Sequence, residues 1–205
     1  NPRGNNALIR GPEGVAISLD GTFALFANSM NENIGRIDLS TNAVTFPYKC
    51  RLKSMYGIAI APDNSYCLVT TDDHGDHKDA IARVDLSSGE ATFLYTVQGG
   101  PRDVAISSDG TFALVACCGS KQYGKEGGST VCRIDLASGD MTRIEDDGFE
   151  QPSGVAISGR CSGKFRIKIV FFVLLETFPP SHSLLTLLEL RKLQRIHLAH
   201  IPLPR

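Results

Sequence analysis

The sequence predicts an all-β protein, and three observations support this class. Four copies of one short apolar motif recur at intervals of 43, 46 and 51 residues. Tight turns and runs rich in Val, Ile, Phe and Thr follow the motif, and no helical pattern separates the runs. The chain has 20 Gly among 205 residues and no Trp, which suits a turn-rich protein. A unit of four short strands with this period is typical of the blades of a β-propeller.

Each repeat begins with the apolar motif, which we interpret as its first strand. In the first three repeats a tight turn and a second apolar run follow. An Asp-Gly pair between two apolar runs predicts a hairpin with a type I′ turn, because that turn needs positive φ. The motif copies are Gly14–Ser18, Gly57–Ala61, Asp103–Ser107 and Gly154–Ser158, and the turns are Asp20-Gly21, Asp63-Asn64 and Asp109-Gly110.

A third strand is predicted at an Arg-Ile/Val-Asp-Leu segment, found at 36–39, 83–86 and 133–136. A turn of Ser, Thr and Gly follows, and a short run such as 43–46 or 91–94 closes the repeat. A single four-stranded blade cannot bury both of its faces. Each repeat is therefore expected to pack between neighbours.

Two segments carry a resemblance to a known class of repeats. Residues 11–22 (GPEGVAISLDGT) and 37–45 (IDLSTNAVT) resemble NHL-type and YVTN-type β-propeller repeats. The first segment and Arg-Ile-Asp-Leu suit the NHL type, and the end of the second suits the YVTN type. The resemblance covers residues ~9–158 and implies a propeller, with the six-bladed TolB-like proteins among the relatives. Such propellers include scaffolds, ligand binders and lactonase-like hydrolases, so the resemblance indicates the fold rather than an activity.

The repeats do not fill a complete propeller. Blades are expected at 9–53, 54–100 and 101–150, and a fourth begins at 151–158. The predicted fold is therefore an incomplete β-propeller of about three four-stranded blades and the first strands of a fourth, followed by a tail that does not repeat.

The tail, 159–205, has a different composition from the repeats. Residues 160–205 contain 8 Lys and Arg against 2 Asp and Glu, whereas residues 1–159 contain 13 against 20. The alternating segment 165–173 suits a second strand of blade 4, and the leucine-rich segment 184–199 suits a helix. Such a helix would cover the open edge of the last blade or bind a partner. The abrupt change favours a third interpretation, that the tail is not genuine coding sequence.

Composition excludes several classes of function. A net charge of −1 argues against nucleic-acid binding through bulk charge. No apolar run reaches the ~18 residues that a membrane span requires. The six cysteines show neither paired zinc-ligand spacing nor a dense disulfide pattern, so free thiols are expected.

The connections between strands predict a binding face. Those at 28–34, 72–80, 117–130, 47–54, 96–102 and 145–152 are long, differ in every repeat, and would share one face of a propeller. Loops on a rigid scaffold carry function. The sequence favours a non-enzymatic scaffold that binds a protein, carbohydrate or small ligand on this variable-loop face. The alternative is a lactonase-like or hydrolase-like enzyme with a divalent cation in the central channel. Open blade edges also predict self-association.

One loop combines residue types that bind ligands or metals. Its candidates are Asp72, Asp73, His74, Asp76, His77 and Asp79. Asp72, Asp76 and His77 are the candidate ligands for Ca²⁺ or Zn²⁺, although the spacing is not that of an EF-hand and no cofactor is firmly predicted. A solvated surface loop is the simpler interpretation. No catalytic residue is proposed, because nothing pairs a nucleophile with a base.

Six polar residues recur once in every complete repeat. A catalytic group is needed at one centre, whereas a group that recurs in each blade suits a structural role. The aspartates are expected to accept hydrogen bonds from the backbone of the next turn, and the arginines to pair with them or with a neighbouring blade. These residues are Asp38, Asp85, Asp135, Arg36, Arg83 and Arg133.

Overall fold

A computed structural model describes residues 9–71, 79–97, 99–119, 129–144, 151–161 and 164–171, without the side chains of 158–161 and 164–171. Within these residues, the strands form three four-stranded antiparallel sheets and one two-stranded sheet. The helical content of the same residues is one short 3₁₀ turn, η1 (Ser29–Asn31). The predicted class, an all-β chain of about three blades and the first strands of a fourth, is confirmed.

Each complete sheet contains four strands that are consecutive in the sequence. Blade 1 consists of β1 (Pro12–Ile17), β2 (Phe23–Asn28), β3 (Asn33–Asp38) and β4 (Val44–Tyr48). Blade 2 consists of β5 (Met55–Ile60), β6 (Tyr66–Thr71), β7 (Ala80–Asp85) and β8 (Ala91–Thr96). Blade 3 consists of β9 (Pro101–Ile106), β10 (Phe112–Cys117), β11 (Thr130–Asp135) and β12 (Met141–Ile144), and blade 4 of β13 (Pro152–Cys161) and β14 (Lys164–Phe171).

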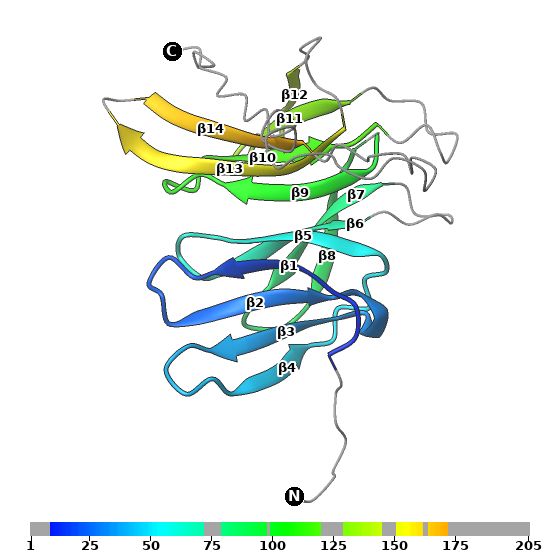
Figure 1. Ribbon diagram of the computed structural model, residues 1–205, viewed down its shortest axis with the longest axis vertical. Helices are drawn as coiled ribbons and strands as arrows, with labels where there is room; N and C mark the ends of the chain where they lie inside the picture. Colours follow the sequence, from blue (N-terminus) through cyan, green and yellow to red (C-terminus); the bar gives the residue numbers. More distant parts are fainter. Residues whose placement is uncertain are drawn as a thin grey trace, which may run out of the picture.

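The blades form an arc around their first strands. β1 contacts β5, β5 contacts β9 and β9 contacts β13, so these four inner strands lie side by side (Figure 1). The outer strands β4, β8 and β12 lie at the far edge of each sheet. This radial arrangement of antiparallel sheets is that of propeller blades.

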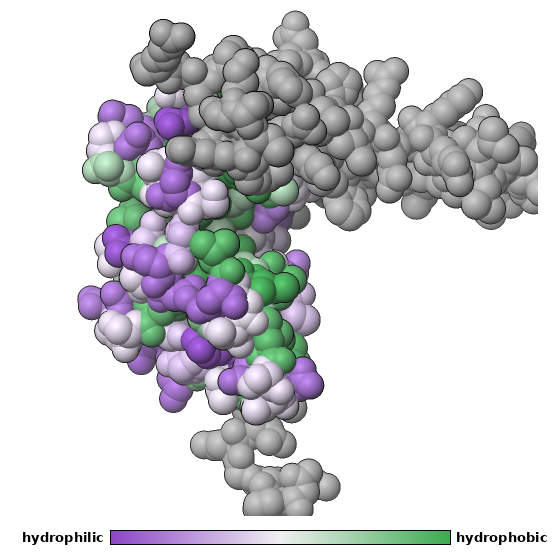
Figure 2. All heavy atoms as spheres, turned by 90° about the vertical axis from the view of Figure 1, so that its left-hand side faces the viewer, coloured by the Kyte–Doolittle hydropathy of each residue, from purple (hydrophilic) through white to green (hydrophobic). Residues whose placement is uncertain are grey.

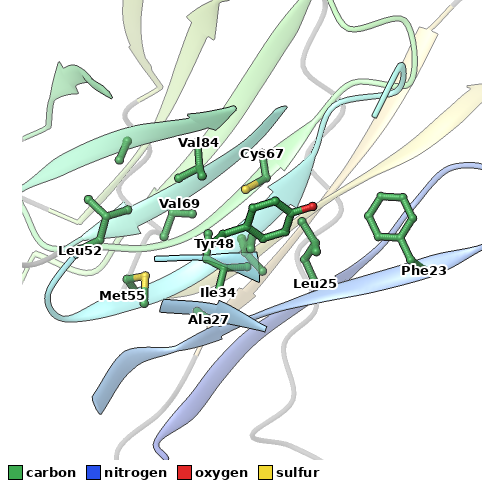
Figure 3. Close-up of a cluster of buried hydrophobic side chains, with 12 residues drawn as sticks. Phe23, Leu25, Ala27, Ile34, Tyr48, Leu52, Met55, Cys67, Val69 and Val84 are labelled. Atoms are coloured by element: carbon green, nitrogen blue, oxygen red, sulfur yellow. The ribbon is translucent and has the colours of Figure 1, made fainter. Parts of the chain in front are cut away.

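The hydrophobic core lies between the blades rather than within one sheet. We call the side of a blade that meets the next blade its forward face and the opposite side its back face. At the first interface, Phe23 and Leu25 on the forward face of blade 1 join Cys67, Val69 and Val84 on the back face of blade 2 in one buried cluster (Figure 3). Similar clusters join blades 2 and 3 and blades 3 and 4. Each blade thus buries its apolar side chains against its neighbours.

The first hairpin of each complete blade turns differently from the prediction. The amide of Gly21 donates to the carbonyl of Ser18 at 2.9 Å, so Leu19 and Asp20 occupy the centre of the turn. Gly21 has a positive φ of 70°, whereas Asp20 is not among the residues with positive φ. A type I′ turn needs positive φ at both central residues, so that prediction is wrong. The left-handed residue that follows the turn recurs as Asn64 (φ 59°) and Gly110 (φ 70°).

The structure describes only the beginning of the tail. β14 covers most of the segment 165–173 that was predicted as the second strand of blade 4. The helix predicted over 184–199 lies outside the described residues. Among the helices of the described part of the chain, none has the length and hydrophobicity to cross a membrane.

Candidate functional site

The four inner strands share one irregularity near their beginning. In β9, Pro101 pairs with Cys117 and Asp103 with Ala116, so that the register of the ladder skips Arg102. The pairing of β1, β5 and β13 shifts at the equivalent place. A β-bulge of this kind re-aims a side chain and is frequent beside functional sites. The repeat therefore presents one differently aimed residue per blade, next to the axis of the arc.

The bulged residue differs in each blade, although the residues that follow it are similar. One carries a carboxylate, one a phenol, one a guanidinium and one a hydroxyl, and each is exposed or half-buried. All four lie near the beginning of their inner strand, which is the end of the arc with the variable connections. We call these four residues the bulge ring; they are Glu13, Tyr56, Arg102 and Ser153.

Two members of the bulge ring are in contact. The guanidinium carbon of Arg102, on blade 3, lies 4.2 Å from the ring centroid of Tyr56, on blade 2. The Nε of Arg102 also donates to the Sγ of Cys118 at 3.5 Å. A cation over an aromatic face is attracted by the quadrupole of the ring. The pair therefore places a fixed positive charge on an aromatic platform between two blades.

Glycine lets the inner strands approach each other beside the bulge ring. A Cβ added at Gly57 would lie 2.5 Å from the Cα of Asp103, and one added at Gly14 would overlap the carbonyl oxygen of Tyr56. The amide of Gly57 donates instead to the buried hydroxyl of Thr70 at 2.8 Å. Here a side chain satisfies a backbone donor that the bulge removes from the ladder.

Asp103 occupies the position that is Gly in the other three copies of the motif. Its Oδ2 accepts a hydrogen bond from the amide of Val155 on blade 4, and its Oδ1 accepts one from the amide of Val104, both at 2.9 Å. Burial raises the pKa of Asp103, and the two amide donors oppose that rise. The carboxylate thus connects blades 3 and 4 directly beneath the bulge ring.

Of the six ligand candidates predicted in the acidic loop, Asp79 lies within the described residues. It is 7% exposed, its Oδ2 accepts from the amide of Gly100 at 2.9 Å, and its carbonyl accepts from the amide of Val97 at 2.8 Å. Asp79 therefore ties the start of β7 to the connection between β8 and β9, and its role in ligand binding stays a prediction. The other five, Asp72, Asp73, His74, Asp76 and His77, lie outside the described residues. Within the described ranges, no three His, Cys, Asp or Glu side chains form a group that could hold a metal ion.

The three repeated aspartates each accept hydrogen bonds from the turn that follows them. Oδ1 of Asp38 accepts from the amides of Ser40 and Thr41 at 3.0 and 2.9 Å. The hydroxyl of Ser40, with the amide of Thr41, lowers the pKa of Asp38 to about 2. These turns join the third and fourth strands, so they lie at the end of the blades opposite the bulge ring. The equivalent turns are formed by Asp85 and Asp135.

The three repeated arginines stack on aromatic rings of the adjacent strand. The guanidinium carbon of Arg36 lies 3.8 Å from the ring centroid of Phe23. The sequence predicted pairs with aspartates or with a neighbouring blade, and the aromatic partner was missed. The signal was present, because an aromatic residue leads the second strand of each complete blade. The equivalent pairs are Arg83 with Tyr66 at 4.0 Å and Arg133 with Phe112 at 4.8 Å.

The cysteines whose side chains are described are free thiols, as predicted. Cys67, Cys117 and Cys132 are buried, and Cys50 and Cys118 are half-buried. Burial raises the pKa of Cys67 far above that of an exposed thiol, which keeps it protonated.

A shallow hollow of about 330 Å³ lies elsewhere, at the outer edge of blade 2. Because β8 is the outermost strand of that sheet, the hollow is remote from the bulge ring. Much of the wall of this hollow consists of polar residues in or beside the turn between β7 and β8. The lining residues are Arg83, Asp85, Ser88, Glu90, Thr92 and Leu94.

Comparisons with known proteins give matches among solved structures. No family model matches the chain, and no curated protein matches it. The chain superimposes on the hydrazine synthase of Kuenenia stuttgartiensis with a TM-score of 0.64 and 21% identity, over 86% of this chain and 47% of that one. It superimposes on a chain of a nidogen/laminin complex with a TM-score of 0.65 and 14% identity, over 78% and 60%. It superimposes on TolB from Acinetobacter baumannii with a TM-score of 0.54 and 21% identity, over 80% and 41%.

At these identities the likeness concerns the fold alone. The chain spans about half the length of the solved chains that it matches. Together with the radial sheets and the shared inner-strand bulges, the matches identify the chain as an arc of β-propeller blades.

Proposed function

We propose that the chain is a non-enzymatic binding module, and that it recognises a protein ligand at the bulge ring. The observation that carries this proposal is the contrast within each inner strand. The bulged residue changes its chemical type from blade to blade, whereas the residues that pack the blades together are similar in every copy. A scaffold that repeats its core and varies one aimed side chain per repeat is suited to recognition.

The residue types in the ring favour a protein over a carbohydrate or a small ligand. Tyr and Arg are enriched among the residues that dominate binding energy at protein interfaces. Tyr56 and Arg102 already contact each other, which reduces the entropy lost when a ligand orders them. The structurally similar chain from a nidogen/laminin complex further supports a protein as the ligand.

Selection of peptides from a random displayed library on the immobilised protein tests the proposal. Enriched peptides would be titrated calorimetrically into the wild type, the Arg102→Ala variant and the Arg83→Ala variant. Arg83 also stacks on an aromatic ring, but it belongs to the repeated structural set away from the ring. We expect Arg102→Ala to weaken binding about 30-fold, which corresponds to the loss of ~2 kcal/mol that marks a hot spot.

Arg83→Ala is expected to leave the affinity unchanged. Equal affinity of the wild type and Arg102→Ala would refute the bulge ring as the binding site.

The finer assignment to NHL-type or YVTN-type repeats rests on the motifs at 11–22 and 37–45, and it remains part of this proposal.

The composition of the acidic loop favours a second candidate, a hydrolase-like propeller with a bound divalent cation. Four carboxylates and two imidazoles within residues 72–79 are ligand types for Ca²⁺ and Zn²⁺. Calorimetric titration of each ion into the wild type and an Asp72→Asn/Asp76→Asn variant distinguishes the two candidates. A tight stoichiometric site that the double variant loses would favour the hydrolase, and the absence of binding would leave the binding module.

A further inference from the structure

The back face of blade 1 is an apolar surface that no described residue covers. Val15 in β1 is 65% exposed, as is Ile17, and Leu19 and Val44 are also exposed. Figure 2 shows hydrophobic residues along the right-hand side of the lower, described part of the molecule. That side is the front of Figure 1, where blade 1 lies. The pairing of the strands places Val15, Ile17 and Val44 on one face of this sheet.

The same position is buried in every other blade. The residues equivalent to Val15 are Ile58 in β5, Val104 in β9 and Val155 in β13, and they are 4%, 3% and 6% exposed. Each of them packs on the forward face of the preceding blade. Blade 1 thus presents the fourth instance of an interface whose other three instances are occupied by a blade of this repeat.

The composition of the face matches that of an interface. An antiparallel sheet that faces water alternates apolar residues with polar ones, so its outer face is polar. On the back face of blade 1, Phe26 lies over Gly35 and makes an edge-to-face contact with Phe46 at 6.0 Å between ring centroids. Eight strand positions on this face carry no charge and no hydrogen-bonding side chain. Val15, Ile17 and Val44 among them are exposed, whereas Ala24, Phe26 and Gly35 are buried within the single chain; the other two are Ile37 and Phe46. At one end of the same face, the side-chain amide of Asn28 donates to the Oδ1 of Asn33 at 2.9 Å.

One residue of the corresponding forward face is described at the other end of the chain. In each occupied interface, the alanine that follows the bulge contributes to the same cluster as the buried aliphatic residue of the next blade. These pairs are Ala16 with Ile58, Ala59 with Val104, and Ala105 with Val155. The next member of the series is Ala156 on blade 4, and it is exposed.

We propose that a second copy of this chain covers the back face of blade 1 with the forward face of its blade 4. The contact is heterologous, because the two faces differ, and two identical contacts related by a twofold axis close a ring. Two copies supply six complete blades and two partial ones, which lies within the ~4–8 blades of known propellers. Ala156 of each copy then packs on Val15 of the other.

Light scattering coupled to size-exclusion chromatography tests the number of copies. The wild type at tens of micromolar is expected at about 44 kDa, twice the 22.1 kDa of one chain. A Val15→Asp/Ile17→Asp variant is expected at the monomer mass, because the introduced charges would be buried without partners at the contact. Met141→Asp is the matched control, since Met141 is an exposed apolar residue on an outer strand, and it is expected to remain a dimer.

Three results would overturn the proposal: a monomeric wild type, a mass that continues to rise with concentration, or a dimer that survives Val15→Asp/Ile17→Asp. Val15 is exposed within one chain, so its replacement is expected to leave the far-ultraviolet circular dichroism spectrum unchanged. If the double variant does not fold, Val15→Ser carries the same expectation with a smaller perturbation.

Crosslinking between copies tests which faces meet. A tagged Val15→Cys chain mixed with an untagged Ala156→Cys chain is expected to give a mixed covalent dimer with a short thiol-specific crosslinker. Val15→Cys mixed with wild type controls for the native cysteines. Tagged Leu94→Cys, on the outer strand β8, provides the matched control and is expected to give no mixed product with Ala156→Cys. A mixed product of equal yield in either control would overturn the head-to-tail arrangement.

Discussion

Replacing Gly57 by Ala should separate blades 2 and 3 at their inner strands. The added Cβ would lie 2.5 Å from the Cα of Asp103, 2.8 Å from its Oδ1 and 2.9 Å from the amide nitrogen of Val104. Two of these three atoms belong to the backbone, so no rotation of a side chain relieves the overlap. Overpacking typically costs about 1–3 kcal/mol, and contact with backbone places this site in the upper half of that range.

A smaller effect of the same substitution offsets part of this loss of stability. Alanine restricts the unfolded chain more than glycine does, which contributes about 0.4–1 kcal/mol of stability. The net loss expected for Gly57→Ala is therefore about 1–2.5 kcal/mol. For a chain of this length, each kcal/mol lowers the melting temperature by about 2–4 °C. Equilibrium unfolding in urea and calorimetry would measure both quantities.

Gly21→Ala provides the control for this prediction. Its Cβ would meet nothing within 4 Å, so only the left-handed backbone with φ of 70° opposes the substitution. For alanine the left-handed conformation costs roughly 1–2 kcal/mol of stability, and the greater restriction of the unfolded chain offsets part of this cost. If Gly57→Ala proves no more destabilising than Gly21→Ala, the inner strands are not held in backbone contact and the reasoning fails.

Three further predictions concern the bulge, the turns and the thiols. Thr70→Val keeps the shape of the side chain but leaves a buried amide of β5 without its acceptor, so urea unfolding should show a loss of about 1–3 kcal/mol, and an unchanged midpoint would contradict this. Because the pKa values of Asp38 and Asp85 lie at about 2 in the folded chain and 3.8 is the ordinary value, their contribution to stability is present above pH ~4 and disappears as the pH falls toward 2. Asp38→Asn/Asp85→Asn keeps the acceptor oxygens and should flatten this loss in urea titrations at several pH values, whereas an equal slope would argue against it. Half-buried Cys118 should react with a thiol reagent in the native protein long before buried Cys67, as peptide mapping would show; equal rates would contradict the burial.

Much of the fold could be predicted because its determinants are local. The spacing of the motif that begins at Gly14, Gly57 and Gly154 marked the inner strands, and the turns near Asp20 and Asp38 marked their ends. Alternation within strands and turn chemistry are properties of short segments. The type I′ prediction failed because Asp20 accepts a hydrogen bond from the amide of Thr22 at 2.9 Å, which favours a turn with Gly21 after it rather than within it.

The bulge ring could not be predicted in the same way, because a bulge is a property of pairing between strands. Nothing next to Arg102 in the sequence shows that Pro101 pairs with Cys117 while Asp103 pairs with Ala116. The sequence does contain a weak signal of the bulge. The residue before the motif differs in each copy, and Asp103 replaces the Gly that begins the other three copies. The ligand candidates at 72–78 were chosen for their side-chain chemistry, and their arrangement lies outside the described residues.

The bulge on each inner strand places the side chain that varies between blades outside the pairing that stabilises the sheet. A bulged residue is left out of the ladder, so its replacement leaves the pairing of the strands in place, although replacing Arg102 would remove its contact with Tyr56 on the neighbouring blade. Natural variants could exchange these side chains without altering the pairing of the strands, and an engineer could randomise the same four codons while every sheet keeps its register. Under the proposed function, the residues that recognise the ligand occupy one position in each blade.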